Sequence, residues 1–328
     1  MDMDWKSLAD KVIDGEAITK EEAKAIVEAP DSELLAVLDA AYRVRSHFHG
    51  NKVRIHVLQN AKSGVCPEDC AFCSQSMKYN NDVEQYGMQS KEDLLAGAKS
   101  AYERGATTYC MVTATRGPSW GEVKHLSEVV SEIKEKYDLD ICASLGLLKE
   151  GQAEALAEAG VDRYNHNLET SGDHFETLVS THTYEDRVRT VTWAKQAGME
   201  ACCGGIIGMG EQKEDWVELA FTLRELEVES VPVNFLNPRP GTPMDKHQMP
   251  RPQDCLKALS MFRFVHPDVD VRVAGGREVV LGSMQAMALY AANSFFTEGY
   301  LTTGGQGESS DAAMLREAGF EPVVVQAT

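Results

Sequence analysis

Residues 53–73 read Val53-Arg-Ile-His-Val-Leu58, a short connection, and then Cys66-Pro-Glu-Asp-Cys70-Ala-Phe-Cys73. The β-rich run predicts a strand, and the cysteines begin about eight residues after it, in a loop that contains Gly64. Similar β-rich runs recur along the chain and are separated by helical patterns. They are Thr107–Val112, Asp140–Ser144, Arg163–Asn167, Glu200–Gly204, Ser230–Phe235, Asp270–Val273 and Ala292–Phe296.

The segments between these runs have the apolar spacing of amphipathic helices. One stripe consists of Val123, Leu126, Val130, Ile133 and Tyr137, and another of Tyr184, Val188, Val191 and Ala194. Gly105, Gly160 and Gly198 each end a helical pattern just before a strand, where a left-handed residue is needed. Alternating strands and helices predict an α/β fold with parallel strands, and eight units favour a (β/α)8 TIM-type barrel. A doubly wound open sheet is the alternative.

The ends of the chain differ from this repeat. Residues 1–45 predict an N-terminal helical extension: Thr19 and Glu22 have capping-box spacing, and Pro30-Asp31 restarts a helix. We expect the barrel to span residues 46–300 and a short C-terminal extension to span residues 301–328.

The composition narrows the classes of partner. The chain has 328 residues, 51 acidic and 32 basic, and a net charge of −19, which argues against nucleic acids and anionic membrane surfaces. The acidic start lacks a secretory signal, and no run approaches the ~20 apolar residues of a membrane span. We therefore expect a cytoplasmic protein whose eight cysteines are reduced and serve metal binding or catalysis more than disulfides.

The first three cysteines have C-x3-C-x2-C spacing. Three thiolates from Cys66, Cys70 and Cys73 suit a 4Fe–4S cluster, which normally takes four cysteines, so one iron remains open. On a βα loop of a barrel they lie at the face where active sites occur. A zinc site and unrelated cysteines are the alternatives, although structural zinc takes four ligands and no histidine lies nearby.

Other cysteines fall within the predicted strands. Cys110, Cys142 and the pair Cys202-Cys203 lie on the second, third and fifth strands, where inward-facing residues meet in layers. Three such thiols suit a second cluster, whereas each alone is typical of a buried apolar cysteine. Because Cys202 and Cys203 face opposite sides of their strand, only one is a ligand. Cys203 has no assigned role, and neither has Cys255, which is typical of a helix core.

The cysteine motif resembles the signature of the radical S-adenosylmethionine (SAM) superfamily, and from about residue 50 to 320 the chain resembles the biotin synthase family. The matching stretches are Gly64–Cys70, Tyr109-Cys110, Tyr164–Thr170, Cys202–Glu211, Ser230–Asn234 and Val271–Glu278. The resemblance implies a 2Fe–2S cluster held by Cys110, Cys142, Cys202 and Arg272. General chemistry does not favour arginine as a metal ligand. Alternatively, Arg272 points inward and its positive charge balances the charge of the cluster.

The resemblance also implies the cofactor and substrate contacts. SAM is expected against Gly205, Gly208 and Gly210, with Glu169 at its ribose and Arg187 at its carboxylate. Dethiobiotin is expected beside Asn165, Asn167 and Asn234, with Asn167 touching SAM as well. Two positions depart from part of the family: several members have aspartate at Glu169, and some have arginine at Thr108.

The implied reaction is sulfur insertion that converts dethiobiotin to biotin. A flavodoxin- or ferredoxin-like donor reduces the 4Fe–4S cluster, SAM yields a 5′-deoxyadenosyl radical, and a sulfide of the 2Fe–2S cluster enters the product. Cys110, Cys142 and Cys202 are then catalytic as sulfur-donor ligands, and the family suggests a homodimer. Alternatives are another radical SAM enzyme, such as a methylornithine synthase or a hydrogenase-maturation relative, a cluster carrier, and a structural zinc protein.

Overall fold

Strand β1 (Lys52–Lys62) pairs with β2 (Thr108–Thr113) on one side and with β9 (Ser294–Phe296) on the other, which closes the sheet into a barrel. The computed structural model describes residues 3–297 and 299–323. The order around the barrel is β1-β2-β3-β4-β5-β7-β8-β9, with all neighbours parallel. The other strands are β3 (Asp140–Ser144), β4 (Arg163–Asn165), β5 (Glu200–Cys202), β7 (Ser230–Phe235) and β8 (Asp270–Val273). The predicted barrel is confirmed, and the open-sheet alternative is wrong.

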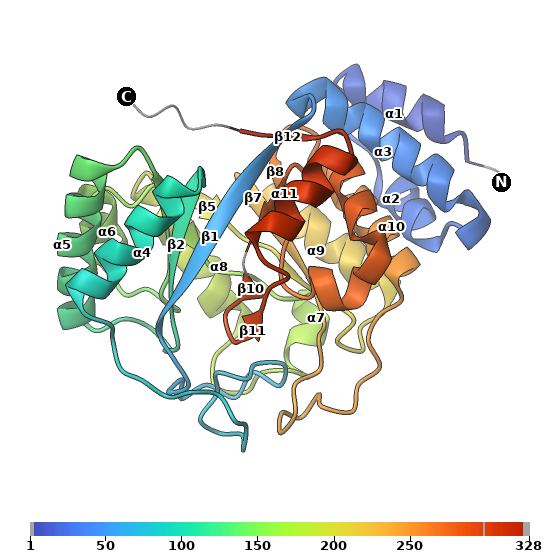
Figure 1. Cartoon of the computed structure of the whole chain (residues 1–328). Coiled ribbons are helices and arrows are strands. Elements are labelled where there is room, and N and C mark those ends of the chain that lie inside the picture. The colour runs from blue at the N-terminus through green and yellow to red at the C-terminus, as the bar shows by residue number, and fades with distance from the viewer. Residues whose placement is uncertain (1–2, 298, 324–328) are drawn as a thin grey trace.

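Helices follow the strands and cover the outside of the barrel (Figure 1). They are α4 (Lys91–Glu103), α5 (Trp120–Lys136), α6 (Gln152–Glu158), α7 (Gly172–Phe175), α8 (Tyr184–Gln196), α9 (Lys213–Glu225) and α10 (Pro252–Val265). Gly105, Gly160 and Gly198 have φ angles of 71°, 98° and 90°. They therefore end their helices in the left-handed region, as predicted. No helix among residues 3–297 and 299–323 has the length and apolar character to cross a bilayer.

The N-terminal helices form the expected layer at the upper right of Figure 1. They are α1 (Trp5–Ile13), α2 (Lys20–Glu28), the short 3-10 turn η1 (Asp31–Glu33) and α3 (Leu34–His49). Both hydrogen bonds of the Thr19–Glu22 capping box are present. The layer is fixed to α10 by Lys257, whose buried Nζ donates to Ala29 O over 2.8 Å and contacts Asp31 Oδ1 at 2.9 Å.

The C-terminal part folds back over the barrel. After β8 come a π-helical turn η2 (Arg277–Leu281) and a 3-10 segment η3 (Gly282–Tyr290), and beyond β9 a hairpin of β10 (Gly299–Tyr300) and β11 (Thr303–Gly304). Helix α11 (Glu308–Glu317) and β12 (Glu321–Pro322), which extends the pairing of β1, follow. The buried Arg277 pairs with Asp311 at 2.7 Å and ties α11 to the barrel. Residues 324–328 of the expected extension lie outside the described residues.

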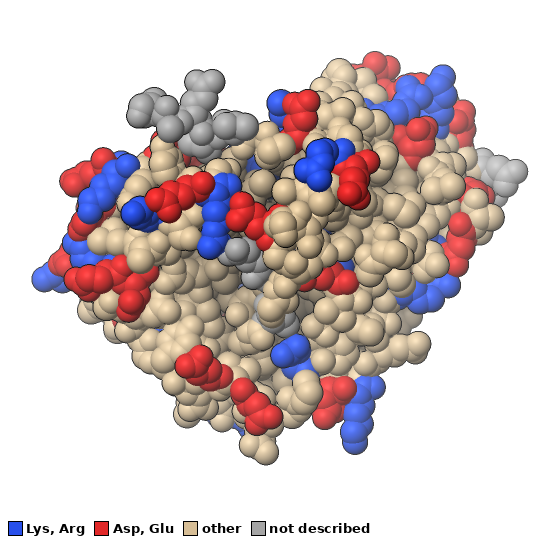
Figure 2. Space-filling model, in the orientation of Figure 1, with Lys and Arg blue, Asp and Glu red and all other residues tan. Residues whose placement is uncertain are grey.

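The carboxyl ends of the strands, and the loops that leave them, lie at the bottom of Figure 1. On the face shown in Figure 2, acidic and basic side chains are interleaved over the upper helices, and the centre is mostly uncharged. Among the ion pairs of the helices, Glu132 of α5 contacts both Lys91 of α4 and Lys136.

Candidate active site

A cavity of about 290 Å³ lies at the carboxyl ends of the strands. This is the end at which barrel enzymes place their active sites. The cavity is lined by residues of loops and of strands that the sequence analysis predicted to be functional. They are Cys66, Cys70, Cys73, Cys110, Cys142, Asn165, Asn167, Glu169, Arg187, Asn234 and Arg272.

The cysteine loop between β1 and α4 is held closed by its own backbone. Cys66 N donates to Gln75 O over 3.2 Å, and Met77 N donates to Cys66 O over 2.9 Å. The Gln75 side chain also accepts from Gly64 N at 2.8 Å. The loop therefore keeps Cys66, Cys70 and Cys73 on one side of the cavity. Nothing in the sequence pattern indicated that Gln75 would hold the loop closed.

The three loop thiols suit a cluster that supplies positive charge. All three are free cysteines, and burial raises their pKa values, that of Cys73 to about 12. Iron favours the thiolate over the thiol and so offsets this cost of burial. The 4Fe–4S cluster expected from the sequence fits these residues, and their number leaves one iron without a cysteine.

Arg187 of α8 joins the cysteine loop to the strand ends. Its Nη1 donates to Asn167 O over 2.7 Å and contacts Glu169 Oε1 at 3.2 Å, while Nη2 lies 3.9 Å from Cys70 Sγ. Its Nε donates to His182 Nε2 over 2.9 Å, and the other ring nitrogen of His182 contacts Glu68. The sequence analysis missed Glu68 and His182, which are joined across 114 positions and follow no local pattern.

Glu169 has an unusual backbone. Glu169 is buried, and its φ of 74° lies in the left-handed region that residues other than glycine rarely adopt. The backbone is held by hydrogen bonds from Glu169 N to Gly204 O at 3.1 Å and from Ile206 N to Glu169 O at 2.8 Å. Strained residues of this kind concentrate at ligand sites. Asn167 Nδ2 contacts Glu169 Oε2 at 3.4 Å, so both side chains face the cavity together.

The glycine-rich segment after β5 contains Gly204, Gly205, Gly208 and Gly210. It includes the short strand β6 (Gly205–Ile207), which pairs with β7, and only then bends through Gly208 and Gly210 with φ angles of 102° and 98°. Ile206 lines the cavity, whereas Gly205, Gly208 and Gly210 are not among its lining residues. A Cβ on Gly205 would stand 2.5 Å from Glu169 O, so glycine allows β6 to approach the site closely.

The second cysteine set lies deeper, on the strands themselves. Cys110 and Cys142 are register partners on β2 and β3, and Cys142 shares thiol hydrogen bonds with Cys110 and with Cys202 of β5. The bond with Cys110, together with burial, raises the pKa of the Cys142 thiol, whereas the bond with Cys202 lowers it. Arg272 Nη1 faces Cys202 Sγ at 3.5 Å, and its buried Nε has no partner among the described residues. Three converging thiols and one guanidinium fit the 2Fe–2S cluster expected from the sequence.

The neighbouring cysteines point elsewhere. Cys203 is fully buried in the apolar layer between the barrel and its helices, with Ala220 and Val231, on the opposite side of β5 from the Cys202 contacts. Cys255 is fully buried in α10, within the same layer. Both thus have a packing environment and lie away from the cavity.

The amide side chains expected near the substrate are held by the protein. Asn165 Nδ2 donates to Cys202 Sγ over 3.2 Å, and Asn165 Oδ1 accepts from Ser144 Oγ over 3.2 Å. Asn234 Nδ2 donates to Gly205 O over 3.0 Å, and its Oδ1 accepts from Gly275 N over 2.8 Å. Each amide therefore has a fixed orientation at the cavity wall.

Other residues of the wall had no assigned role in the sequence. His166 lines the cavity, and its buried Nε2 has no partner among the described residues. Thr302 also lines it and contacts Ser74 at 2.9 Å, which links the C-terminal hairpin region to the cysteine loop. Thr108 lies on β2 beside His56 of β1, with its buried hydroxyl unpartnered in the described chain.

Comparison with known proteins identifies the family. Residues 61–223 match the Radical SAM superfamily, and residues 232–321 match the Biotin and Thiamin Synthesis associated domain. A biotin synthase of Salinibacter ruber is 65% identical over 322 residues, which cover 98% of this chain and 90% of the relative. This chain belongs to the biotin synthase family. A biotin synthase of Rhodopirellula baltica supports the same assignment. It is 52% identical over 97% of this chain and 88% of its own length.

Solved structures show how widely the fold is shared. A methylornithine synthase has a TM-score of 0.83 at 21% identity, covering 96% of this chain and 97% of its own. A maturase of the [FeFe]-hydrogenase has a TM-score of 0.83 at 15% identity, covering 98% of this chain and 76% of its own. At these identities the likeness shows the barrel alone.

Family membership confirms the main functional expectations. The biotin synthase family consists of radical SAM enzymes that insert sulfur into dethiobiotin, and they use SAM, a 4Fe–4S cluster and a 2Fe–2S cluster. The family is the one that the matching stretches between Gly64 and Glu278 resemble.

Proposed function

We propose that this chain converts dethiobiotin to biotin in one cavity that serves both clusters. The observation that carries this proposal is that Cys66, Cys70 and Cys73 line the same cavity as Cys110, Cys142 and Arg272. A radical formed at the first set and a sulfur held at the second must both reach one substrate, and a shared cavity makes this possible.

The residues between the two sets suit the two small molecules. Arg187 places positive charge beside Cys70, where the carboxylate of SAM needs a cation, and we assign Glu169 and Asn167 to the ribose and the neighbouring substrate. Asn165 and Asn234 have fixed amides that suit the donors and acceptors of a ureido ring. Gly205, Gly208 and Gly210 shape the backbone against SAM.

The chain's part in the reaction is to position and to exclude water. When bound, the first cluster and SAM supply a carbon-centred radical that abstracts hydrogen, and the second cluster supplies the sulfur. Asn165 and Asn234 would orient the acceptor carbons, and Cys110, Cys142 and Cys202 would hold the cluster that supplies the sulfur. The aromatic rings of Phe296 and Tyr300 form part of the cavity wall and would keep solvent away from the carbon radical.

We also propose the finer features of the working protein. A flavodoxin- or ferredoxin-like donor reduces the first cluster, the enzyme works as a homodimer in the cytoplasm, and nucleic acid is not a partner. The net charge of −19 supports the last point. The division at residues 1–45, 46–300 and 301–328 is supported by the helices before β1, although α3 continues to His49.

The deciding experiment is an anaerobic incubation of reconstituted protein with SAM, a reductant and dethiobiotin, with biotin and 5′-deoxyadenosine measured by mass. Both products are expected. Deoxyadenosine without biotin would move the substrate to another radical SAM reaction, such as that of a methylornithine synthase. Neither product, from protein that holds both clusters, would favour a cluster carrier, and colourless protein would favour zinc.

A Cys142→Ala variant tests the sulfur assignment. We expect it to retain SAM cleavage and to lose most biotin formation, because the first cysteine set is intact. Cys255→Ala is the matched control, since Cys255 is also buried but lies in α10. Normal biotin yield from Cys142→Ala would show that the second set is not the sulfur donor site.

A further inference from the structure

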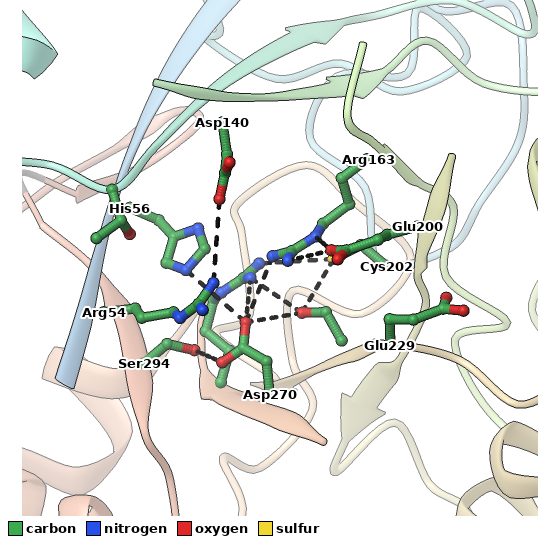
Figure 3. A network of polar contacts seen from close by, with 12 residues as sticks. Arg54, His56, Asp140, Arg163, Glu200, Cys202, Glu229, Asp270 and Ser294 are labelled. Atoms are coloured by element: carbon green, nitrogen blue, oxygen red, sulfur yellow. Dashed lines mark hydrogen bonds and ion pairs between the residues drawn. The ribbon is translucent and has the colours of Figure 1, made fainter. Parts of the chain in front are cut away.

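A buried carboxylate lies on the same strand as Arg272. Asp270 and Arg272 are two residues apart on β8, so their side chains lie on the same face of the strand. The two residues are 8% and 1% exposed. Figure 3 shows Asp270 at the centre of a polar network that also includes His56, Arg163 and Ser294.

The Asp270 carboxylate is held on both oxygens. Oδ1 accepts from Ser294 Oγ at 2.5 Å and from Asn293 Nδ2 at 3.2 Å, and Oδ2 accepts from Ser230 Oγ at 3.1 Å. These partners come from β9, the residue before it, and β7. The carboxylate is thus fixed from the strands on either side of β8.

Asp270 in turn holds one end of the Arg272 guanidinium. Arg272 Nη2 donates to Asp270 Oδ2 over 3.0 Å and to Ser230 Oγ over 3.0 Å, while Nη1 faces Cys202 Sγ at 3.5 Å. Because a guanidinium is planar and rigid, fixing Nη2 also fixes the direction of Nη1. The Phe296 ring lies 5.1 Å from the guanidinium carbon and limits movement on that side.

A second buried cation shares the same carboxylate. Arg163 of β4 is 4% exposed, places Nη1 at 3.5 Å from Asp270 Oδ2 and donates Nε to Glu200 over 2.9 Å. His56 Nε2 lies 3.8 Å from the same oxygen. Without Asp270, Arg163 would keep Glu200, but Arg272 would lose its carboxylate partner, and burying a cation unpaired is costly.

We infer that Asp270 is a positioning residue for the second cluster, because it anchors Nη2 of Arg272 and so directs Nη1 toward Cys202 and the cluster site. It acts through Arg272 and does not itself touch the reacting atoms. This inference rests on the proposed function, since it requires a cluster at Cys110, Cys142 and Cys202.

The test is a double-mutant cycle on cluster retention. Asp270→Asn keeps the shape of the side chain and removes its charge, and Arg272→Ala removes the guanidinium that Asp270 holds. Asp268→Asn is the matched control, because Asp268 is exposed and lies just before β8. Each variant is reconstituted, and the visible spectrum of the second cluster and its rate of loss to an iron chelator are measured. SAM cleavage by the first cluster is measured in parallel.

We expect Asp270→Asn to change the spectrum and to speed cluster loss roughly tenfold or more, as the loss of a charged hydrogen bond implies. Asp268→Asn should match the wild type, and SAM cleavage should be retained in every variant. In the Arg272→Ala background, adding Asp270→Asn should have no further effect on the rate. An unchanged spectrum and rate in Asp270→Asn, or the same acceleration in the Arg272→Ala background, would overturn the inference.

If Asp270→Asn folds poorly, a milder variant provides the same test. Ser294→Ala removes one of the hydrogen bonds to Oδ1 and should speed cluster loss by a smaller factor that also vanishes in the Arg272→Ala background. An unchanged or background-independent rate would count against Asp270. Wild-type protein that cleaves SAM but binds no second cluster would overturn the proposed sulfur source and this inference together, whereas biotin formation with an unaltered Asp270→Asn cluster would overturn the inference alone.

Discussion

Arg187 donates its Nε–H to Nε2 of His182 over 2.9 Å. This bond makes Nε2 an acceptor, so the ring proton lies on Nδ1, which faces the Glu68 carboxylate. Glu68 belongs to the cysteine loop and Arg187 to α8. One imidazole therefore sets the position of the guanidinium relative to the cysteines.

We expect His182→Ala to weaken SAM binding. Without the imidazole, Arg187 loses one of the bonds that fix it, so KM for SAM should rise roughly tenfold while kcat stays within about threefold. Steady-state formation of 5′-deoxyadenosine measures both constants. His47→Ala, on the exposed end of α3, is the control. A fall in kcat at unchanged KM would contradict this role for His182.

Cys202 and Cys203 form a matched pair for the second cluster. Cys202 contacts Arg272 and Asn165, and Cys203 packs in the outer apolar layer. Cys202→Ala should abolish the second cluster, whereas Cys203→Ala should retain it and lose about 1 kcal/mol of unfolding free energy. Iron and sulfide analysis, together with urea unfolding, distinguishes the two. Full cluster content in Cys202→Ala would refute its assignment as a ligand.

Gly205→Ala should disturb the SAM site from behind. The new Cβ would stand 2.5 Å from Glu169 O and 2.6 Å from Leu219 Cδ2, so β6 or Glu169 must move. We expect a loss of about 1–3 kcal/mol in stability and a higher KM for SAM. Gly121→Ala in α5 meets only Ser119 Oγ at 3.9 Å and should be neutral or stabilising by about 0.5–1 kcal/mol. Equal effects of both changes on KM would argue against a local cause.

His266 should make stability depend on pH. Burial, opposed by its hydrogen bond with Ala220 O, lowers the pKa of His266 to about 3. The unfolded chain has an ordinary imidazole pKa of about 6.5, so between these values it binds more protons than the folded state. Stability therefore rises with pH across this window and is lost as pH falls below about 6.5.

The measurement for His266 is urea unfolding at pH 7 and pH 5.5. Wild type should lose about 1 kcal/mol more than His266→Gln over this interval. His47→Gln, at an exposed position, should keep the wild-type slope. Parallel slopes for wild type and His266→Gln would show that this imidazole does not contribute.

Much of the fold was predictable because its signals are local. The runs Val53–Leu58, Ser230–Phe235 and Asp270–Val273 each contain two or three β-branched residues. Gly105, Gly160 and Gly198 end their helices with positive φ as their positions indicated. The opposite placement of Cys202 and Cys203 follows from strand alternation alone. Strand β6 was not predicted, since a glycine run is typical of a turn and only the partner strand β7 makes it extended.

The parts of the site that sequence reasoning missed depend on distant segments. Glu68 and His182 are neighbours only because the cysteine loop and the start of α8 lie at the same end of the barrel. Asp270 and Arg163 meet across the barrel interior, 107 positions apart. No spacing rule connects such pairs. The first cysteine set was detectable from its C-x3-C-x2-C spacing, and the second from the joint placement of thiols on three predicted strands.

The barrel closes only when β9 pairs with β1. On the ribosome, β9 is the last barrel strand to emerge, long after the cysteine loop that follows β1 and the cysteines of β2, β3 and β5. Until it inserts, the interior that will hold Arg272 and Phe296 against the second cysteine set has an open side. We therefore expect the second cluster to enter a finished pocket only after nearly the entire chain has been made, and we expect truncation before Ser294 to leave the strand cysteines in a barrel that cannot close.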